Sequence, residues 1–275
     1  MNSSGDPVRG RLRLIEDGAH SGVFNMSADE LLFQRQIDCR SADALIRFYR
    51  FSEPTTTVGY GAWRLARRLC GGLARNQVSS DVPVIRRATG GGIVRHETDF
   101  IYSLVVPIAA RPALASVQES YFLIHRAFQQ ALKSLGLESE LYDEPHTSQL
   151  SPNFNGQSSK RSEEGSPNFN GQSSKRSEEG SPNFNGQSSK RSEEGSPYCF
   201  DTPVRYDVML CGEKIAGAGQ RRSRGYLLQQ GSIAWRSLTE RVPMLSESAF
   251  TMRFALSLAD ALGFEITMGT YCTEV

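Results

Sequence analysis

The chain has 275 residues, of which 39% are hydrophobic and 22% charged, with a formal net charge of +1. This balance is typical of a globular protein and gives no electrostatic reason to expect a nucleic-acid partner. No apolar stretch approaches the roughly 18 residues of a membrane span, and the first twenty residues lack the apolar core of a secretory signal, so we expect a cytoplasmic protein without a membrane partner. The five cysteines include no Cys-x-x-Cys pair, which argues against a disulfide framework and predicts no metal site.

The first half of the chain is predicted to contain one helix and several short strands. The capping-box sequence Ser27-Ala28-Asp29-Glu30 precedes apolar residues and predicts a helix over 26–38. Aromatic and β-branched residues predict strands. These strands cover 44–51, 55–61, 82–88 and 100–106, and the last two, on either side of a glycine run, are expected to pair.

The second half is predicted to hold a β-meander between two helices. Apolar residues in steps of three or four predict a long helix from Val117 to Leu135, closed by Gly136. Three strand-like runs separated by turn residues predict the meander. They cover 204–211, 214–221 and 226–235, and a last helix covers about 245–262. Strands in hairpins with a few separate helices predict an α+β fold rather than a doubly wound sheet.

Residues 151–195 are three identical copies of Ser-Pro-Asn-Phe-Asn-Gly-Gln-Ser-Ser-Lys-Arg-Ser-Glu-Glu-Gly. Each copy has one aromatic residue and no Leu, Ile or Val, so burial cannot offset the entropy cost of ordering it. We predict a disordered insertion, with a phosphorylatable or partner-binding tether as the alternative. The other 230 residues have the size of one catalytic domain, so we expect a single domain over 1–275 that carries this insertion.

The segment Arg86–His96 contains three consecutive glycines after a β-type run. Such glycines mark backbone that another group must approach closely. The segment lacks the lysine of a P-loop, but two arginines beside exposed amides suit a phosphate or a carboxylate. A tight hairpin turn and a core histidine are the alternatives. We predict substrate-binding roles for Arg87, Gly90, Gly91, Gly92 and His96.

The segment 212–222 contains a single lysine among small residues. Its Gly217-Ala218-Gly219 is not a dinucleotide fingerprint, because Arg222 stands where the third glycine belongs. Lys214 follows a turn and, as a strand residue, should lie on the opposite face from Ile215. A catalytic lysine and a solvated edge lysine both fit this position.

Together, in this order, the two segments resemble the biotin/lipoate ligase and octanoyltransferase superfamily, which handles protein-bound lipoyl groups. Lys214 matches the lysine of its Lys-x-x-Gly element, Gln220-Arg221-Arg222 continues the match, and 24–30 resembles its first helix. The resemblance implies a class II synthetase-like domain: a mixed, largely antiparallel sheet flanked by helices. It also implies a catalytic Lys214 and substrate-binding Gly217 and Gln220. Two positions depart from the pattern, Gly219 for an expected Ala and Gln230 for a common His.

The segment Tyr198–Asp207 resembles the Cys-Phe-x-x-Pro-x-x-Tyr-(Glu/Asp) pattern of one octanoyltransferase branch, in which the cysteine is the nucleophile. This resemblance implies that Cys199 takes an octanoyl group from octanoyl-acyl carrier protein and works with Lys214. The acceptor would be a lysine on a lipoyl domain of a 2-oxo acid dehydrogenase or on the glycine-cleavage H protein. No metal or cofactor is expected.

Three alternatives remain open at this point. An ATP-dependent lipoate ligase would use ATP and Mg, and some ligases keep a similar Cys-Phe segment. An amidotransferase would move lipoyl or octanoyl groups between carrier proteins, and a non-catalytic acyl-binding relative would not need Cys199. Many ligases carry an accessory C-terminal domain, whereas this sequence ends about a dozen residues after its last predicted helix, which favours the transferase.

Overall fold

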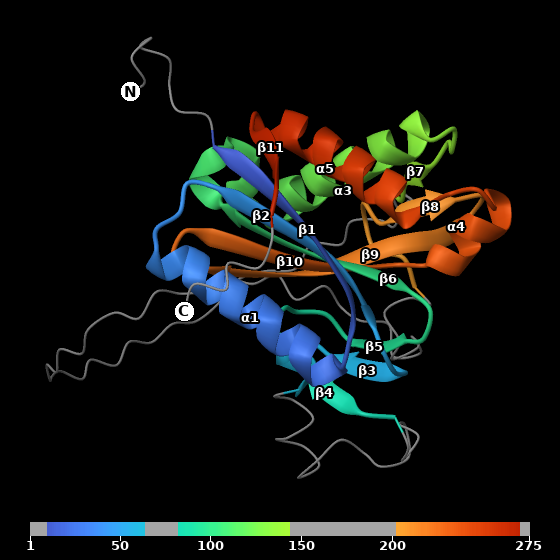
Figure 1. Cartoon of the computed structure of the whole chain (residues 1–275), viewed down its shortest axis with the longest axis horizontal. Coiled ribbons are helices and arrows are strands. Elements are labelled where there is room, and N and C mark those ends of the chain that lie inside the picture. The colour runs from blue at the N-terminus through green and yellow to red at the C-terminus, as the bar shows by residue number, and fades with distance from the viewer. Residues whose placement is uncertain (1–9, 64–81, 144–201, 270–275) are drawn as a thin grey trace, which may run out of the picture. The chain divides into compact units, whose positions relative to one another are not determined.

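The computed structural model describes residues 10–63, 82–143 and 202–269 (Figure 1). Within them, eight strands form one sheet in the order β11-β1-β2-β6-β10-β9-β8-β7. The strands are β1 (Arg11–His20), β2 (Ala44–Phe51), β6 (Phe100–Pro107), β7 (Glu140–Leu141), β8 (Val208–Leu210), β9 (Glu213–Ser223), β10 (Tyr226–Ile233) and β11 (Glu265–Met268). β1 is parallel to β2 and β11, and the other neighbours are antiparallel. The predicted α+β fold with a mixed, largely antiparallel sheet is confirmed.

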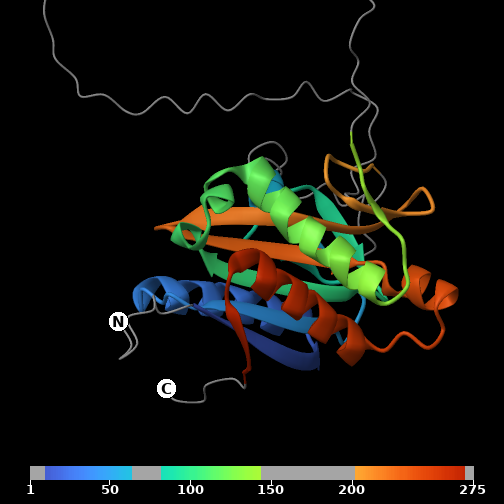
Figure 2. The same cartoon turned by 90° about the horizontal axis from the view of Figure 1, so that it is seen from above.

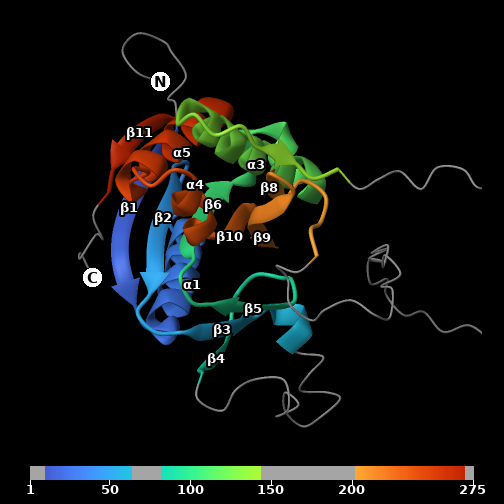
Figure 3. The same ribbon diagram turned by 90° about the vertical axis from the view of Figure 1, so that its right-hand side faces the viewer.

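A second, smaller sheet contains β4 (Val84–Arg86), β3 (Thr55–Val58) and β5 (Ile93–His96) in that order. Figure 3 shows it beside one end of the large sheet. The prediction that 82–88 and 100–106 pair is wrong, because β4 pairs with β3 whereas β6 lies between β2 and β10. The glycine run therefore leads from β4 into β5 around the inserted strand β3, and sequence reasoning missed β5.

Helices cover both faces of the large sheet (Figure 2). α3 (Val117–Ser134) and α5 (Glu247–Leu262) pack against each other, with Phe128 against Phe254 in a core that also contains Leu104 and Val106. α1 (Gly22–Asp38) covers the opposite face, where Val105 joins a separate cluster. This alternation along β6 follows from the two-residue period of a strand. It shows that β6 is buried on both faces.

The predicted helices form, and the starts of α1 and α5 are shifted, whereas α3 begins at Val117 as predicted. α3 ends just before Gly136, whose φ is +82°, as predicted. α1 begins at Gly22 instead of 26, because the Ser21 hydroxyl accepts from the amide of Phe24 and caps the helix in place of the predicted Ser27 box. The prediction of a strand to 235 extends too far, since α4 (Trp235–Arg241) begins there. Within the described ranges, no helix has the length and apolarity needed to span a membrane.

The predicted meander is confirmed in β8, β9 and β10, although β8 begins at 208 instead of 204. Its two turns are Cys211-Gly212, with φ of +52° and +78°, and Arg224-Gly225, with φ of +46° and +83°. Positive φ at both central residues is the hairpin conformation that matches strand twist. The meander places β9 beside the small sheet, where the two segments singled out in the sequence meet.

Candidate functional site

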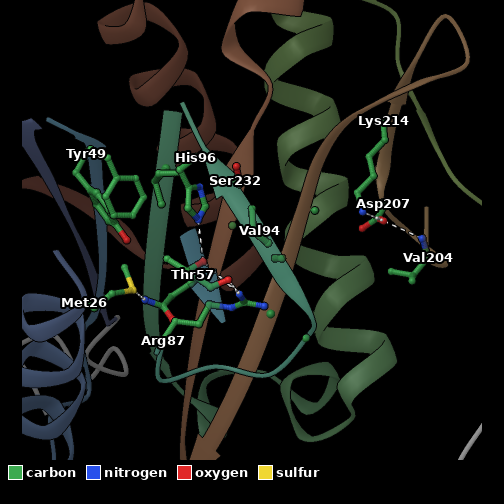
Figure 4. A pocket seen from close by; sticks show the side chains of 18 of the residues that line it. Met26, Tyr49, Thr57, Arg87, Val94, His96, Val204, Asp207, Lys214 and Ser232 are labelled. Atoms are coloured by element: carbon green, nitrogen blue, oxygen red, sulfur yellow. Dashed lines mark hydrogen bonds and ion pairs between the residues drawn. The ribbon is translucent and has the colours of Figure 1, made fainter. Parts of the chain in front are cut away.

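A mainly apolar pocket of about 150 Å³ lies between the small sheet, α1, α3 and the meander. Figure 4 shows Met26 and Tyr49 at one end and Val204, Asp207 and Lys214 at the other. Met26 is 7% exposed and Tyr49 fully buried, whereas Val204 is 51% exposed. The pocket is therefore closed at the Met26 end and opens at the Lys214 end.

Arg87 lines the pocket, yet its guanidinium holds the protein's own backbone. Its Nη2 lies 2.8 Å from the carbonyl oxygen of Gly90, and its Nη1 lies 3.2 Å from the carbonyl oxygen of Thr57. These donors tie the glycine run to β3, so Arg87 shapes the pocket wall. Its role in substrate binding stays a prediction.

The glycines of 90–92 bring backbone segments together, as predicted, but the approaching group is another part of the chain. A Cβ at Gly219 would lie 2.6 Å from the Gly90 oxygen, and one at Gly59 would lie 2.1 Å from the Gly91 oxygen. Gly91 lines the pocket, whereas Gly90 and Gly92 lie outside its lining. Gly219, found where the family pattern has Ala, therefore allows the glycine run to sit directly against β9.

His96 lines the middle of the pocket and is bonded at both ring nitrogens. Its Nδ1 lies 2.6 Å from Asp99 Oδ2 and its Nε2 lies 2.8 Å from Thr57 Oγ1. Burial raises the pKa of Asp99, but the hydrogen bond and charge of His96 and the hydroxyl of Ser232 outweigh it and lower that pKa overall. Asp99 thus stays ionised, and His96 forms a fixed part of the wall.

Lys214 forms a buried ion pair at the open end of the pocket. Its Nζ lies 2.8 Å from Asp207 Oδ2, with the lysine side chain 8% exposed and the Asp207 side chain fully buried. Ile215 is buried on the opposite face, as predicted. A Cβ at Gly217 would lie 2.7 Å from Lys214 Cε, so the Lys-x-x-Gly spacing gives the lysine side chain room to fold over β9. The interpretation of Lys214 as a solvated edge residue is therefore wrong.

Asp207 and Tyr121 support Lys214, and sequence reasoning assigned neither a role in the site. The Tyr121 hydroxyl donates to Asp207 Oδ1 at 2.5 Å, and the backbone amide of Val204 donates to Oδ2 at 2.8 Å. Burial, reinforced by the Asp207 charge, raises the pKa of Tyr121 well above its usual value, so its hydroxyl keeps its proton. Asp207 was visible only as the acidic end of the Cys-Phe pattern, and Tyr121 only as an apolar step of a helix.

Gln220, predicted to bind substrate, lies outside the pocket lining. Its Nε2 donates to Gln229 Oε1 at 2.7 Å, and its Oε1 accepts from Arg222 Nη1 at 2.7 Å. The side chain is occupied by its neighbours on the meander. This placement does not favour a direct role in substrate binding.

The closed end of the pocket covers a buried carboxylate that sequence reasoning did not single out. Asp29 accepts hydrogen bonds from four side chains. They are Arg47 at 2.8 Å, Tyr49 at 2.8 Å, Ser103 at 2.7 Å and Gln230 at 2.7 Å. Gln230, the second departure from the family pattern, also accepts from Thr89 at 2.9 Å. These polar groups form hydrogen bonds with one another. The closed end can therefore contact an alkyl chain without leaving them unsatisfied.

Cys199, the predicted nucleophile, lies outside the described residues and precedes Thr202 by three positions in the sequence. The carbonyl oxygen of Thr202 lies 3.5 Å from Lys214 Nζ. Cys211 is exposed in a hairpin turn.

The model of the lipoyl protein ligase A/B catalytic domain matches residues 21–247, which include both segments and every residue of the pocket. The chain belongs to this family. The family resemblance inferred from the sequence is confirmed.

The chain is similar to several proteins named octanoyltransferase LipM. The chain is 29% identical to octanoyltransferase LipM of Carboxydothermus hydrogenoformans over 221 residues, covering 80% of this chain and 64% of the relative. LipM of Bacillus subtilis is 27% identical, with the same coverage of both chains. The chain thus spans slightly less than two thirds of these relatives' length.

Solved structures with the same fold are lipoate ligases. A lipoate-protein ligase A bound with ATP superposes with a TM-score of 0.54 at 14% identity, covering 97% of this chain and 90% of that one. The bi-partite lipoate protein ligase of Thermoplasma acidophilum gives 0.52 at 16% identity, covering 97% and 89%. At these identities the likeness establishes the fold of the family domain.

Proposed function

We propose that this chain is an octanoyltransferase of lipoate biosynthesis that carries the acyl group as a thioester on Cys199. The observation that carries the proposal is the buried Lys214–Asp207 pair at the open end of an apolar pocket, with Thr202 against Lys214 and Cys199 three residues before it. The similarity to LipM octanoyltransferases supports the same reaction. The donor is octanoyl-acyl carrier protein, and the acceptor is a lysine of a lipoyl domain or of the glycine-cleavage H protein.

The pocket suits a medium-length alkyl chain. An apolar cavity of about this volume holds a ligand the size of benzene, and the open end leaves room for the carbonyl and the carrier. Each buried CH₂ contributes about 0.8 kcal/mol, so an octanoyl tail would gain roughly 5 kcal/mol. The tail lies toward Met26 and Tyr49, and the thioester carbonyl lies at Lys214.

The first step transfers the acyl group to the enzyme. The Cys199 thiolate attacks the thioester carbonyl, a new C–S bond forms, and the carrier thiolate leaves and takes up the proton released from Cys199. Lys214, ion-paired with Asp207, stabilises the thiolate and the oxyanion of the tetrahedral intermediate. In the second step the neutral acceptor amine attacks this new thioester, the C–S bond to Cys199 breaks as the amide forms, and Cys199 leaves as the thiolate while the amine proton passes to solvent.

No nucleotide or metal enters this reaction, because a thioester is already activated for acyl transfer. The reaction needs a reduced Cys199, and the cytoplasm keeps thiols reduced, so we place the protein there. An ATP-dependent lipoate ligase is the second candidate, and it would first have to activate a free acid. An amidotransferase would take its octanoyl group from another carrier protein, and an acyl-binding relative would form no covalent intermediate.

Intact-mass measurement with octanoyl-acyl carrier protein and no ATP tests the proposal. The protein should gain about 126 Da as a hydroxylamine-labile adduct. Cys199→Ser should lose the adduct, and the matched control Cys211→Ser should keep it, because Cys211 lies exposed in a hairpin turn. If instead the wild type forms no adduct and modifies a lipoyl domain only with ATP and free lipoate, the chain is a ligase.

A further inference from the structure

A continuous chain of hydrogen bonds begins at the end of the meander farthest from Lys214. Arg222 Nη1 donates to Gln220 Oε1 at 2.7 Å, and Gln220 Nε2 donates to Gln229 Oε1 at 2.7 Å. Gln229 Nε2 then donates to the Tyr102 hydroxyl oxygen at 2.7 Å. Gln229 and Tyr102 are fully buried. These bonds connect β9, β10 and β6 through their side chains.

His125 on α3 continues this chain to the backbone beside the candidate site. Its Nε2 lies 3.3 Å from the Tyr102 hydroxyl oxygen, and its Nδ1 lies 2.7 Å from the carbonyl oxygen of Tyr206. A carbonyl only accepts, so Nδ1 carries the proton. Burial lowers the pKa of His125, which is therefore neutral and accepts the Tyr102 proton at Nε2. One arrangement of protons thus satisfies every bond from Arg222 Nη1 to the Tyr206 carbonyl, and removing His125 or Tyr102 interrupts the chain.

The backbone at the end of this chain has an unusual conformation. Tyr206 has a φ of +71°, in the left-handed region that non-glycine residues rarely adopt. Its amide donates to the carbonyl of Tyr142 at 2.6 Å, and its carbonyl is the acceptor for His125. The next residue is Asp207, the partner of Lys214. Strained backbone persists only where its surroundings hold it, and such positions cluster at functional sites.

We propose that His125 and Gln220 are positioning residues: the hydrogen-bond chain that they complete fixes the backbone of Tyr206 and thereby aims Asp207 at Lys214. The expected effect on kcat rests on the proposed function, because it concerns the acyl-transfer role of Lys214. The expected coupling between His125 and Asp207 does not rest on it. Gln220, which the sequence placed in the substrate site, acts here from outside the pocket through its contacts with Gln229 and Arg222.

Two substitutions of His125 separate positioning from packing. His125→Asn keeps an amide N–H close to the position of Nδ1, whereas His125→Leu removes the donor. Tyr226→Phe is the matched control, because it also removes a buried donor to a backbone carbonyl, that of Ser41 at 2.9 Å, away from the pocket. The measurements are kcat and KM for octanoyl transfer and the pH profile of Cys199 alkylation in the full chain.

We expect His125→Leu to lower kcat at least tenfold with KM within twofold, and to move the alkylation inflection to higher pH. His125→Asn should recover kcat to within threefold of wild type, and Tyr226→Phe should leave both readouts unchanged. Equal losses in His125→Leu and His125→Asn, or the same loss in Tyr226→Phe, would overturn the positioning role. Should His125→Leu fail to fold, Tyr102→Phe removes only the hydroxyl of the chain and should change both readouts in the same direction.

An equilibrium measurement separates this inference from the proposed function. Chemical unfolding of His125→Leu, Asp207→Asn and the double variant gives a double-mutant cycle that needs no substrate. The positioning role predicts that the two effects on the unfolding equilibrium constant are non-additive by at least tenfold. Additive effects overturn it, whatever the pocket binds. A coupled cycle in a protein that forms no acyl adduct would leave the positioning role standing and remove the transferase assignment.

Discussion

Arg87 and Lys214 are both buried cations that line one pocket, but they have different kinds of partner. Arg87 donates to the carbonyl oxygens of Gly90 and Thr57, whereas Lys214 pairs with the carboxylate of Asp207. Carbonyl groups fixed in the backbone make the arginine a clamp on the pocket wall. The carboxylate of Asp207 forms an ion pair with the lysine at the open end, where the Thr202 carbonyl lies 3.5 Å from Lys214 Nζ. The two cations thus differ in their partners, and the proposed roles of wall residue and reacting group follow that difference.

Replacing Lys214 should give the largest loss of activity. Lys214→Gln keeps an amide that can donate to Asp207 but removes the positive charge, so transfer should fall by about 10²–10³-fold. Because Asp207 then keeps a hydrogen bond in its buried position, stability should change little. Steady-state transfer assays and chemical unfolding measure the two effects. Activity within a few-fold of wild type would show that the charge of Lys214 has no part in the reaction.

Arg87→Ala should show the opposite balance. It leaves the carbonyls of Gly90 and Thr57 without these donors, and each unpaired buried acceptor costs about 1–3 kcal/mol. We therefore expect a stability loss of about 2–4 kcal/mol, a raised KM because the wall loosens, and a smaller effect on kcat than Lys214→Gln. Denaturant unfolding and transfer kinetics test this. A large loss of kcat at unchanged stability would place Arg87 among the reacting groups.

The sequence was sufficient for the parts of the site that depend on neighbours along the chain. Lys214, the turn before it and Gly217 lie within a few residues of one another, and their spacing predicted a lysine on the face opposite Ile215. Two supporting contacts of the site, Thr57 to Arg87 and Tyr121 to Asp207, come from other elements. Thr57 lies 30 residues before Arg87, and Tyr121 lies 86 residues before Asp207. No local pattern indicates such pairs.

The fold shows the same division. The meander and α3 were predictable because a hairpin turn or a helix stripe is a local signal. Strand β5 was missed, and β4 was paired with the wrong strand, because β3 enters between them from an earlier part of the chain. Helix α1 was misplaced at its start because its buried face carries Asn25 and Asp29, which weaken the apolar pattern. Buried polar residues next to the pocket thus interrupt the pattern of apolar residues from which the start of a helix is predicted.

Two glycines on β9 lie next to the two cations: Gly217 is packed against Lys214, and Gly219 against Gly90, whose carbonyl accepts from Arg87. A Cβ at Gly217 would meet the flexible end of Lys214 at 2.7 Å, whereas one at Gly219 would meet the Gly90 backbone oxygen at 2.6 Å. Gly217→Ala should therefore displace the lysine and lower kcat about tenfold with less than about 1 kcal/mol lost in stability. Gly219→Ala should instead cost about 1–3 kcal/mol of stability and change kcat less. Kinetics and unfolding of both variants check this, and equal profiles would contradict it.

Deleting the repeats 151–195 should have the smallest effect, although they precede Cys199 by only four residues. Between the described residues Asp143 and Thr202 the chain has 58 residues, and 13 remain after the deletion. The flanks are joined without the repeats: Tyr142 N–H donates to the Asp207 carbonyl at 2.8 Å, and Arg205 pairs with Asp143 at 3.1 Å. Closing a shorter loop costs less entropy, so the unfolding free energy should rise by about 1 kcal/mol.

Octanoyl transfer by the shortened chain should stay within about twofold of wild type, because the Lys214–Asp207 pair keeps all its described contacts. Circular-dichroism melting and the transfer assay measure the two effects. Deleting a single repeat is the matched control, and it should give a smaller stability gain in proportion to the logarithm of loop length. A fall in melting temperature or a loss of transfer in the 45-residue deletion would show that the repeats take part in holding the Lys214 end.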